Sequence, residues 1–345
     1  MAELPIRRGL HTGQLLMTEA PFHKTPDSPA GDRLRVIYIT SHSRSGSTLV
    51  GSLIGMLDDC CYVGEVWAAW TDGVRANRNC GCGQPFRSCP FWTAVFDRAF
   101  GGFDTPASCD AERAIAHLQS PGEALRLWRS ILHSGRVSTG TSEYHLALIP
   151  LYRAIHDACG GKVIVDSSKL LRYGALIASM PAVDVRFVNV VRDVRGVVLS
   201  RARPALMRDG DVRHAMPGRT RYRVTRVVSR WVARNELSTR LLETFGGLRI
   251  VYEDFVRDPR PALVALAGGG PAKRAMQQLE ADNGATVLQH QLGGNWIRGL
   301  RLDPHQTWPD ELPTVVRLAT TALARPFLRR YRFENRHAGG LLPDH

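Results

Sequence analysis

The chain has 345 residues, of which 44% are hydrophobic, and this is enough for a substantial core in one large domain or two small ones. Its formal charge of +13 favours anionic partners, but the charge alone does not choose among nucleic acid, a lipid surface and a multiply charged small molecule. No segment approaches the roughly 20 apolar residues that cross a bilayer. The N-terminal stretch also lacks the apolar region of a secretory signal, so we expect a cytoplasmic protein without a membrane span.

The first part of the chain predicts an irregular arm, then a strand, a loop and a helix. Residues 1–31 mix Pro, Thr, Gly and His without periodicity. An apolar run predicts a strand over 34–40, and after the sequence SHSRSG a helical pattern covers 47–57. Small and hydroxyl residues between a buried strand and a helix are typical of a phosphate-binding loop. The ATP-binding form of this loop has a Lys after its second Gly, whereas here Ser47 follows Gly46.

The loop has the donors that an anion needs. The amides of residues 45–48 would point at a phosphate, Gly46 would remove a Cβ that blocks close approach, and Arg44 would supply a cation. The dipole of the following helix and nearby hydroxyls add to the attraction. An ordinary turn capped by a Ser is the alternative. We predict that the anion is held by Ser43, Arg44, Ser45, Gly46, Ser47 and Thr48.

A long segment separates this first unit from the next predicted strand. It covers about 100 residues, too many for a simple crossover. Two helical patterns lie within it, near 110–118 and 121–132. We interpret residues 72–145 as a helical insertion that caps the loop end of the sheet.

The cysteines of this segment do not predict a metal site. An odd total of seven, in a chain without an export signal, favours reduced thiols over a disulfide framework. Cys80, Cys82 and Cys89 cluster in NCGCGQPFRSCPFW, but zinc would need a fourth ligand and the spacing is not that of a zinc finger or ribbon. We expect no metal and interpret the segment as a compact turn anchored by Phe91 and Trp92.

Three further apolar runs predict strands near 162–165, 185–191 and 248–252, each followed by a helical pattern. Apolar strands that alternate with helices predict an α/β fold with a central parallel sheet covered by helices on both faces. Because these units lie on both sides of the insertion, we expect a single domain over 32–335 and a C-terminal tail over 336–345.

Arg192 follows directly on the second of these strands, at the edge where ligands bind in open α/β sheets. Ser200 comes eight residues later, about two helical turns, and so returns to the same face. The pair predicts a clamp for a second phosphate. The alternative is an exposed Arg192 that pairs with Asp193. Arginines also recur at helical spacing within 201–240, which indicates a solvated helix face or, as the alternative, a surface that attracts anions.

Four motifs in a fixed order carry a resemblance to a known family: SRSGSTL, VVRDVRGVVLSR, VYEDF followed by DP, and GGNWIRG. Over about residues 35–300 they resemble sulfotransferases that use 3′-phosphoadenosine 5′-phosphosulfate (PAPS), and the cysteine turn ending in CPFW resembles bacterial members. The resemblance implies a P-loop NTPase-like sulfotransferase fold whose insertion binds the acceptor. It also implies metal-free, in-line transfer of the sulfuryl group to a hydroxyl of a small molecule or carbohydrate, with release of 3′-phosphoadenosine 5′-phosphate.

The resemblance further implies roles for individual residues. The loop would hold the 5′-phosphosulfate with Arg44 on the leaving phosphate, and the clamp of Arg192 and Ser200 would hold the 3′-phosphate. Glu65, in CCYVGEVW, matches a Gly-Glu pair whose Glu is the general base of tyrosylprotein and several carbohydrate or bacterial sulfotransferases. Beside the reacting sulfate we expect Lys169, with Asp166 as the alternative base. The C-terminal cofactor segment would be Gly294, Asn295 and Arg298.

Two other functions stay open at this point. The strand that ends in VYED also resembles the magnesium-binding strand of ATPases, which suggests an ATP-dependent kinase. The basic stretch suggests a nucleic-acid-binding protein, although no recognisable nucleic-acid module is present and we expect no such partner. In the sulfotransferase interpretation, Tyr252, Glu253 and Asp254 are structural. No pattern in the sequence specifies an oligomeric state.

Overall fold

The computed structural model describes residues 17–18, 33–118, 142–209, 217–267, 290–293 and 307–334, and isolated positions between 120 and 129 and at 302. Their strands form one sheet in the order β1-β6-β5-β2-β4-β3. The two-residue β1 (Met17–Thr18) is antiparallel to β6, and the other strands run parallel. These are β2 (Leu34–Ser41), β3 (Cys60–Gly64), β4 (Val163–Asp166), β5 (Val183–Val191) and β6 (Gly247–Val251). The predicted α/β fold with a parallel sheet is confirmed.

The strands predicted from apolar runs are all present, and two short strands are additional. β2, β4, β5 and β6 lie within two residues of the predicted ranges. β3 was not predicted, because CCYVG is short and lacks a run of β-branched residues. β1 lies within the segment expected to be irregular, so that expectation is wrong for its two residues; the other residues of 1–31 and the tail over 336–345 lie outside the described part of the chain.

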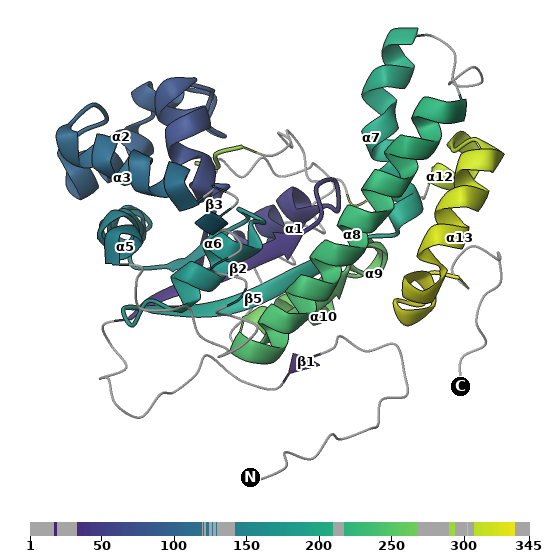
Figure 1. Cartoon of the computed structure of the whole chain (residues 1–345). Helices are drawn as coiled ribbons and strands as arrows, with labels where there is room; N and C mark the ends of the chain where they lie inside the picture. The colour runs from purple at the N-terminus through teal and green to yellow at the C-terminus, as the bar shows by residue number, and fades with distance from the viewer. Residues whose placement is uncertain are drawn as a thin grey trace.

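Alternate residues of β2 belong to different cores, as a strand buried on both faces requires. Val36 and Tyr38 pack into a cluster with α5 (Ser142–Ala158), α6 (Leu171–Ala178) and α8 (Pro217–Phe245). Ile37 and Ile39 pack into a second cluster with α1 (Ser47–Ile54), α9 (Tyr252–Arg257) and α10 (Arg260–Leu266). The sheet is therefore covered by helices on both faces (Figure 1).

Helices extend the molecule at both ends of the sheet (Figure 1). At one end lie α2 (Pro90–Phe100) and α3 (Pro106–Leu118), which contact α5 and belong to the same apolar cluster as Tyr38. At the other end lie α7 (Val194–Asp209), α12 (Trp308–Glu311) and α13 (Thr314–Arg330). Short helical turns η1 (Val66–Ala68), η2 (Ala69–Arg75) and η3 (Phe86–Ser88) connect β3 to α2. The helix predicted over 121–132 lies largely outside the described residues. Among the helices that are described, none has the length and apolar character to span a bilayer.

The cysteines require two corrections. Cys61 in β3 and Cys159 after α5 form a disulfide, so the expectation of reduced thiols only is wrong for this pair. A disulfide is more typical of oxidising compartments, which weakens the argument for a cytoplasmic location. In addition, His290 lies beside the clustered cysteines and supplies the fourth metal-binding group that their sequence spacing lacks. The other five cysteines are free.

Candidate functional site

The loop between β2 and α1 has left-handed backbone at two residues. Arg44 has φ 74°, and Gly46, directly before α1, has φ 89°. Left-handed backbone at a non-glycine residue costs of order 1 kcal/mol and occurs preferentially at functional sites. The amide of Ser45 donates to the carbonyl of His42 at 3.2 Å, so this amide stabilises the turn itself and is not directed at a ligand as the sequence suggested.

Gly46 is required by an aromatic ring that packs against the loop. A Cβ at this position would lie 2.2 Å from two ring carbons of Tyr252. The same ring lies beneath the Arg192 guanidinium, 4.6 Å from its carbon to the ring centroid. Gly46 therefore allows Tyr252, at the start of α9, to lie against both the loop and Arg192. The sequence had explained this glycine by the approach of a phosphate, and the structure adds a reason within the protein.

Arg44, Arg192 and Ser200 come together although they belong to three different elements. Arg44 Nε donates to Ser200 Oγ at 3.0 Å, and Arg192 Nη1 donates to the Arg44 carbonyl at 3.2 Å. The loop, the carboxyl end of β5 and the second turn of α7 thus meet at one point. The sequence predicted two separate anion-binding elements, and in the structure they form one cationic cluster.

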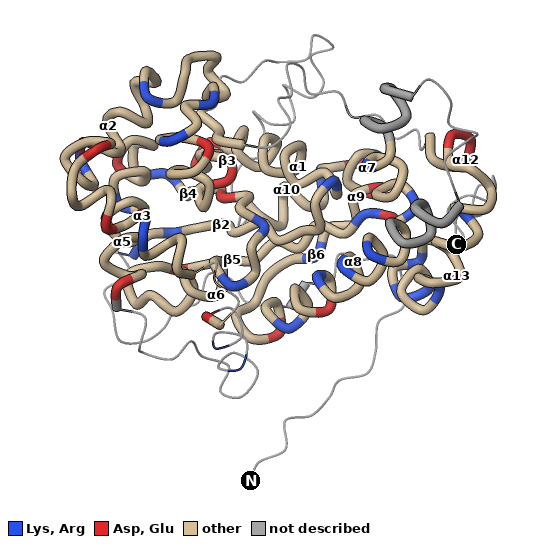
Figure 2. The backbone as a smooth tube through the Cα atoms, turned by 45° about the horizontal axis from the view of Figure 1, so that its top comes forward, with Lys and Arg blue, Asp and Glu red and all other residues tan. Residues whose placement is uncertain are grey.

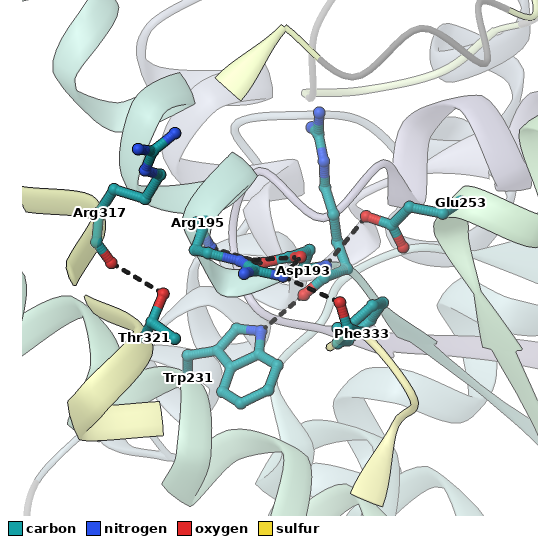
Figure 3. Close-up of polar contacts among 8 residues, drawn as sticks. Asp193, Arg195, Trp231, Glu253, Arg317, Thr321 and Phe333 are labelled. Carbon is teal, nitrogen blue, oxygen red and sulfur yellow. Dashed lines mark hydrogen bonds and ion pairs between the residues drawn. The ribbon is translucent and has the colours of Figure 1, made fainter. Parts of the chain in front are cut away.

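A network of buried polar contacts fixes the backbone that carries Arg192 (Figure 3). Trp231 Nε1 donates to the Arg192 carbonyl at 3.0 Å. Asp193 forms an ion pair with Arg195 at 2.6 Å, and Arg195 also donates to the Phe333 carbonyl at 3.0 Å. The predicted alternative was an ion pair between Arg192 and Asp193, whereas in the structure Asp193 pairs with Arg195. The network leaves the Arg192 guanidinium over the Tyr252 ring, beside the loop.

Glu253 in the VYEDF motif belongs to this network. It is buried, and its Oε1 accepts the amide of Asp193 at 3.0 Å. The pKa of Glu253 is raised to about 7, first because the carboxyl group is buried and second because of the neighbouring Asp193 charge. Because Glu253 is buried and its carboxyl group accepts the Asp193 amide, it is not positioned to coordinate a magnesium ion bound at the loop between β2 and α1. This agrees with the structural role that the sulfotransferase interpretation gave to the motif.

Two buried polar atoms at the cluster have no hydrogen-bond partner within the described part of the chain, namely Ser45 Oγ and Arg192 Nε. Buried polar atoms in native proteins are nearly always paired, so each such atom needs an explanation. Ser45 Oγ lies in the loop directly before α1, where a bound anion would pair with it, whereas Arg192 Nε lies beside α7, since a Cβ built on Gly196 would be 3.3 Å from it. At Ser45, the residues present therefore fit an anion of the kind that the sequence predicted.

His42 is a site residue that the sequence analysis missed. It is buried at the end of β2, and its Nδ1 donates to the Ser43 carbonyl at 2.8 Å. The pKa of His42 is lowered to about 4, mainly because the ring is buried and to a smaller extent because of the charges of Arg201, Arg234 and Arg230. The imidazole is therefore neutral at physiological pH.

Part of the arginine series of α8 faces this site. Figure 2 shows basic residues repeated along α8. Arg234 is half-buried and donates to the Lys169 carbonyl at 2.6 Å, whereas Arg226 and Arg240 are exposed. The side chains of Arg219 and Arg223 are outside the described set. Arg226 and Arg240 are thus on the solvated face that one interpretation expected, and Arg234 holds the backbone of Lys169. The attraction of anions by this helix stays a prediction.

Glu65 and Lys169, the predicted base and its predicted partner, form an ion pair. Their side chains are 17% and 16% exposed, so the pair is largely shielded yet still reaches solvent. The indole nitrogen of Trp67 donates to the other Glu65 oxygen at 3.2 Å, and the Glu65 amide donates to the Leu292 carbonyl at 2.7 Å. Because β3, β4 and β2 are neighbours, the pair lies at the same carboxyl edge of the sheet as the loop.

Asp166 is placed differently from what the sequence suggested. It is fully buried and accepts hydrogen bonds from Tyr152 at 2.5 Å and from the amide and hydroxyl of Ser168 at 2.7 and 2.5 Å. Burial raises the pKa of Asp166 to about 6. Ser168 Oγ in turn accepts the amide of Trp67 at 3.1 Å. A carboxylate enclosed in this way does not meet an acceptor hydroxyl, so we correct its role from alternative base to positioning residue.

The Asp166→Ala variant is expected to lose about 3–5 kcal/mol of unfolding free energy, because it leaves three buried donors without an acceptor. The variant should also lose the pH dependence of the unfolding free energy that Asp166 causes. Since the folded pKa is raised from 3.8 to about 6, the folded chain holds this proton more tightly, and the contribution of Asp166 to stability declines as pH rises through that range. Urea unfolding at several pH values measures both effects. A variant with unchanged stability and abolished turnover would instead indicate a catalytic base.

The predicted cofactor residues Gly294, Asn295 and Arg298 lie outside the described residues. The described residues just before them run beside β3, where Leu292 pairs with Gly64 and its amide donates to the Val63 carbonyl at 2.9 Å. Gly293 lies against Glu65, since a Cβ built on it would be 3.3 Å from the Glu65 Cβ. The segment that leads into the predicted cofactor residues is therefore in contact with the predicted base.

Comparison with solved structures finds chains that are similar over most of this one. A sulfotransferase domain from the Synechococcus PCC 7002 olefin synthase has 19% identity and a TM-score of 0.47, and the match covers 88% of this chain and 96% of that one. A sulfotransferase domain from the curacin biosynthetic pathway has 17% identity and a TM-score of 0.47, with 86% and 98% covered. A sulfotransferase from Mycobacterium avium has 15% identity and a TM-score of 0.44, with 88% and 78% covered. We transfer no residue role from these similarities. No family model and no curated protein matches the chain.

Proposed function

We propose that the chain is a PAPS-dependent sulfotransferase that transfers a sulfuryl group to a hydroxyl of a small-molecule or carbohydrate acceptor. The observation that carries the proposal is the cluster of Arg44, Arg192 and Ser200, where two anion-binding elements meet at the start of α1. PAPS has phosphate groups at both the 5′ and the 3′ position, and ATP lacks the 3′-phosphate. Two cationic elements held side by side therefore favour the bisphosphate nucleotide.

In this proposal the donor is held by residues whose positions are described. The loop residues Ser43–Thr48 hold the 5′-phosphosulfate, with the α1 dipole and Arg44 facing the phosphate that leaves. Arg192 and Ser200 hold the 3′-phosphate. As negative charge develops on the leaving bridge oxygen, fixed cations stabilise the transition state more than the ground state. Gly294, Asn295 and Arg298 remain proposed for the same nucleotide.

Glu65 is proposed as the general base and Lys169 as the cation beside the transferred group. The acceptor oxygen forms a bond to sulfur as the bond from sulfur to the bridge oxygen breaks, and the hydroxyl proton moves to Glu65. The Trp67 indole holds one carboxylate oxygen, and the ion pair with Lys169 orients the other. Lys169 exchanges this contact for the incoming sulfuryl oxygens, which leaves Glu65 free to accept the proton. The insertion over 72–145 is proposed to bind the acceptor.

Incubation with ³⁵S-labelled PAPS and a panel of phenols, alcohols and sugars tests the proposal. We expect transfer of label to at least one hydroxyl acceptor, together with release of 3′-phosphoadenosine 5′-phosphate. Transfer is expected in buffer freed of divalent cations by a chelating resin, because the chemistry of the proposed site uses arginine and lysine as its cations. Transfer of phosphate from ATP in the presence of magnesium, without any sulfuryl transfer, would contradict the proposal and favour a kinase.

A further inference from the structure

Four metal-binding side chains converge at a place outside the proposed active site. Cys80 and Cys82 lie in the turn between η2 and η3, Cys89 lies directly before α2, and His290 comes from a segment 201 residues further along the chain. Their ligand atoms all lie within 4.8 Å of one another. Cys80 and Cys89 are buried, and Cys82 and His290 are partly buried. The cluster thus joins the insertion to a distant part of the sequence.

Four of the six separations between these atoms are close to the edges of a zinc tetrahedron. With Zn–S bonds of about 2.3 Å and Zn–N bonds of about 2.0 Å, a tetrahedral site has S···S edges of about 3.8 Å and S···N edges of about 3.5 Å. The Sγ atom of Cys89 is 3.6 Å from that of Cys82 and 3.6 Å from that of Cys80. His290 Nδ1 is 3.2 Å from Cys89 Sγ and 3.8 Å from Cys80 Sγ.

The same distances do not describe a disulfide, in which the two sulfur atoms are about 2.05 Å apart. The Cys89 sulfur is equally distant from two other sulfurs, whereas a disulfide would draw it to one of them. The donor set of three thiolates and one imidazole around a closed, tetrahedral space is typical of structural zinc. We infer that Cys80, Cys82, Cys89 and His290 bind one structural zinc ion.

Contacts around the cluster hold the ligands in place before any metal binds. The Gly81 amide donates to the Gln291 carbonyl at 2.9 Å, which joins the cysteine turn to the histidine segment. Trp92 Nε1 donates to the His290 carbonyl at 3.0 Å. The Phe91 ring stacks on the His290 imidazole with centroids 4.9 Å apart and planes 3° apart. Such outer contacts orient metal ligands, and here they fix the imidazole with Nδ1 towards the sulfur atoms.

The position of the site suggests what the zinc would stabilise. His290 begins the segment 290–293, in which Leu292 accepts the Glu65 amide and Gly293 lies against the Glu65 side chain. The zinc would therefore fasten this segment, and the predicted cofactor residues that follow it, to the insertion. Metal binding is expected to release the thiol protons to solvent as the three thiolates form. This role is structural and does not depend on which nucleotide the chain binds.

Metal analysis of the purified full-length chain tests the inference without reference to activity. After removal of any affinity tag, exposure to zinc and dialysis, we expect about one zinc per chain by inductively coupled plasma mass spectrometry. Cys82→Ser and His290→Ala should each lose most of that zinc. The matched control Cys109→Ser, at an exposed free cysteine, should keep it. A wild-type chain without zinc, or a Cys82→Ser variant that retains it fully, would overturn the inference.

A variant that lacks a metal-binding side chain could fail to fold, so two further measurements use the wild-type chain. Substitution with cobalt(II) should give the intense visible absorption of a tetrahedral site with thiolate ligands, and weak octahedral bands would overturn the inference. Alkylation of the denatured chain in chelator, without reductant, should modify five cysteines, which are the free ones. Modification of only three cysteines would reveal a second disulfide within the cluster, and this result would also overturn the inference of a zinc site.

Discussion

Glu65→Gln is expected to lower kcat by about 10² to 10⁴-fold, the range that a positioned general base contributes. The affinity for 3′-phosphoadenosine 5′-phosphate should stay unchanged, because Glu65 contacts Lys169 and Trp67 and takes no part in the cluster at Arg44. Glutamine preserves the shape of the side chain and its acceptor for the indole N–H, but it cannot take a proton. Steady-state kinetics and nucleotide calorimetry on the same preparation measure the two quantities.

Two controls test whether the fall in kcat is specific to the loss of the Glu65 carboxylate. Trp67→Phe removes the indole donor to Glu65 and retains the carboxylate, so we expect a much smaller fall in kcat than in Glu65→Gln. Glu143→Gln, at an exposed position of α5, should leave kcat unchanged. Full turnover in Glu65→Gln would exclude Glu65 as the base and would leave Lys169 without a catalytic partner in our scheme.

Arg192→Ala is expected to weaken the binding of 3′-phosphoadenosine 5′-phosphate by about 10²-fold. A hydrogen bond to a charged group contributes roughly 1.5–3 kcal/mol, and 1.4 kcal/mol corresponds to a factor of ten. Adenosine 5′-phosphosulfate, which has no 3′-phosphate, should bind the variant and the wild type equally. Isothermal titration calorimetry with both nucleotides measures the difference, and it isolates the 3′-phosphate from the rest of the ligand.

Arg226→Ala provides the matched control, since Arg226 is exposed on α8 and should affect both nucleotides only through the general positive field. Arg192→Lys should recover part of the lost affinity because it keeps the charge. An equal loss for both nucleotides in Arg192→Ala would contradict the assignment of Arg192 to the 3′-phosphate. It would indicate that removal of the guanidinium from the Tyr252 ring disturbs the loop as a whole.

The elements with strong local patterns were predictable from the sequence. β2, β5 and β6 are apolar runs that end at polar residues, and this pattern needs no tertiary information. The loop at Gly46 and the spacing of Arg192 and Ser200 are also patterns within short stretches of sequence, so they too were predictable. The loop follows β2 and Arg192 follows β5, and these two strands are neighbours in the parallel sheet. The loop and the clamp therefore form one cluster.

The features that the sequence did not predict depend on contacts between distant segments. β3 is stabilised by β4, which lies about 100 residues further on, and its own sequence is only weakly strand-like. The disulfide joins Cys61 and Cys159 across 98 positions. His290 completes the cysteine cluster from a segment with no metal-binding motif. Asp166 appeared to face the site because it ends a strand, but Tyr152 covers it from α5.

The central claim is that the site binds a nucleotide with a 3′-phosphate, and a calorimetric titration with 3′-phosphoadenosine 5′-phosphate tests it most directly. The wild-type chain, in buffer without added divalent cations, is predicted to bind this nucleotide at one site, and more tightly than it binds ATP with or without magnesium. The absence of binding, or tighter binding of magnesium-ATP, would contradict the assignment of Arg44, Arg192 and Ser200 to a bisphosphate nucleotide.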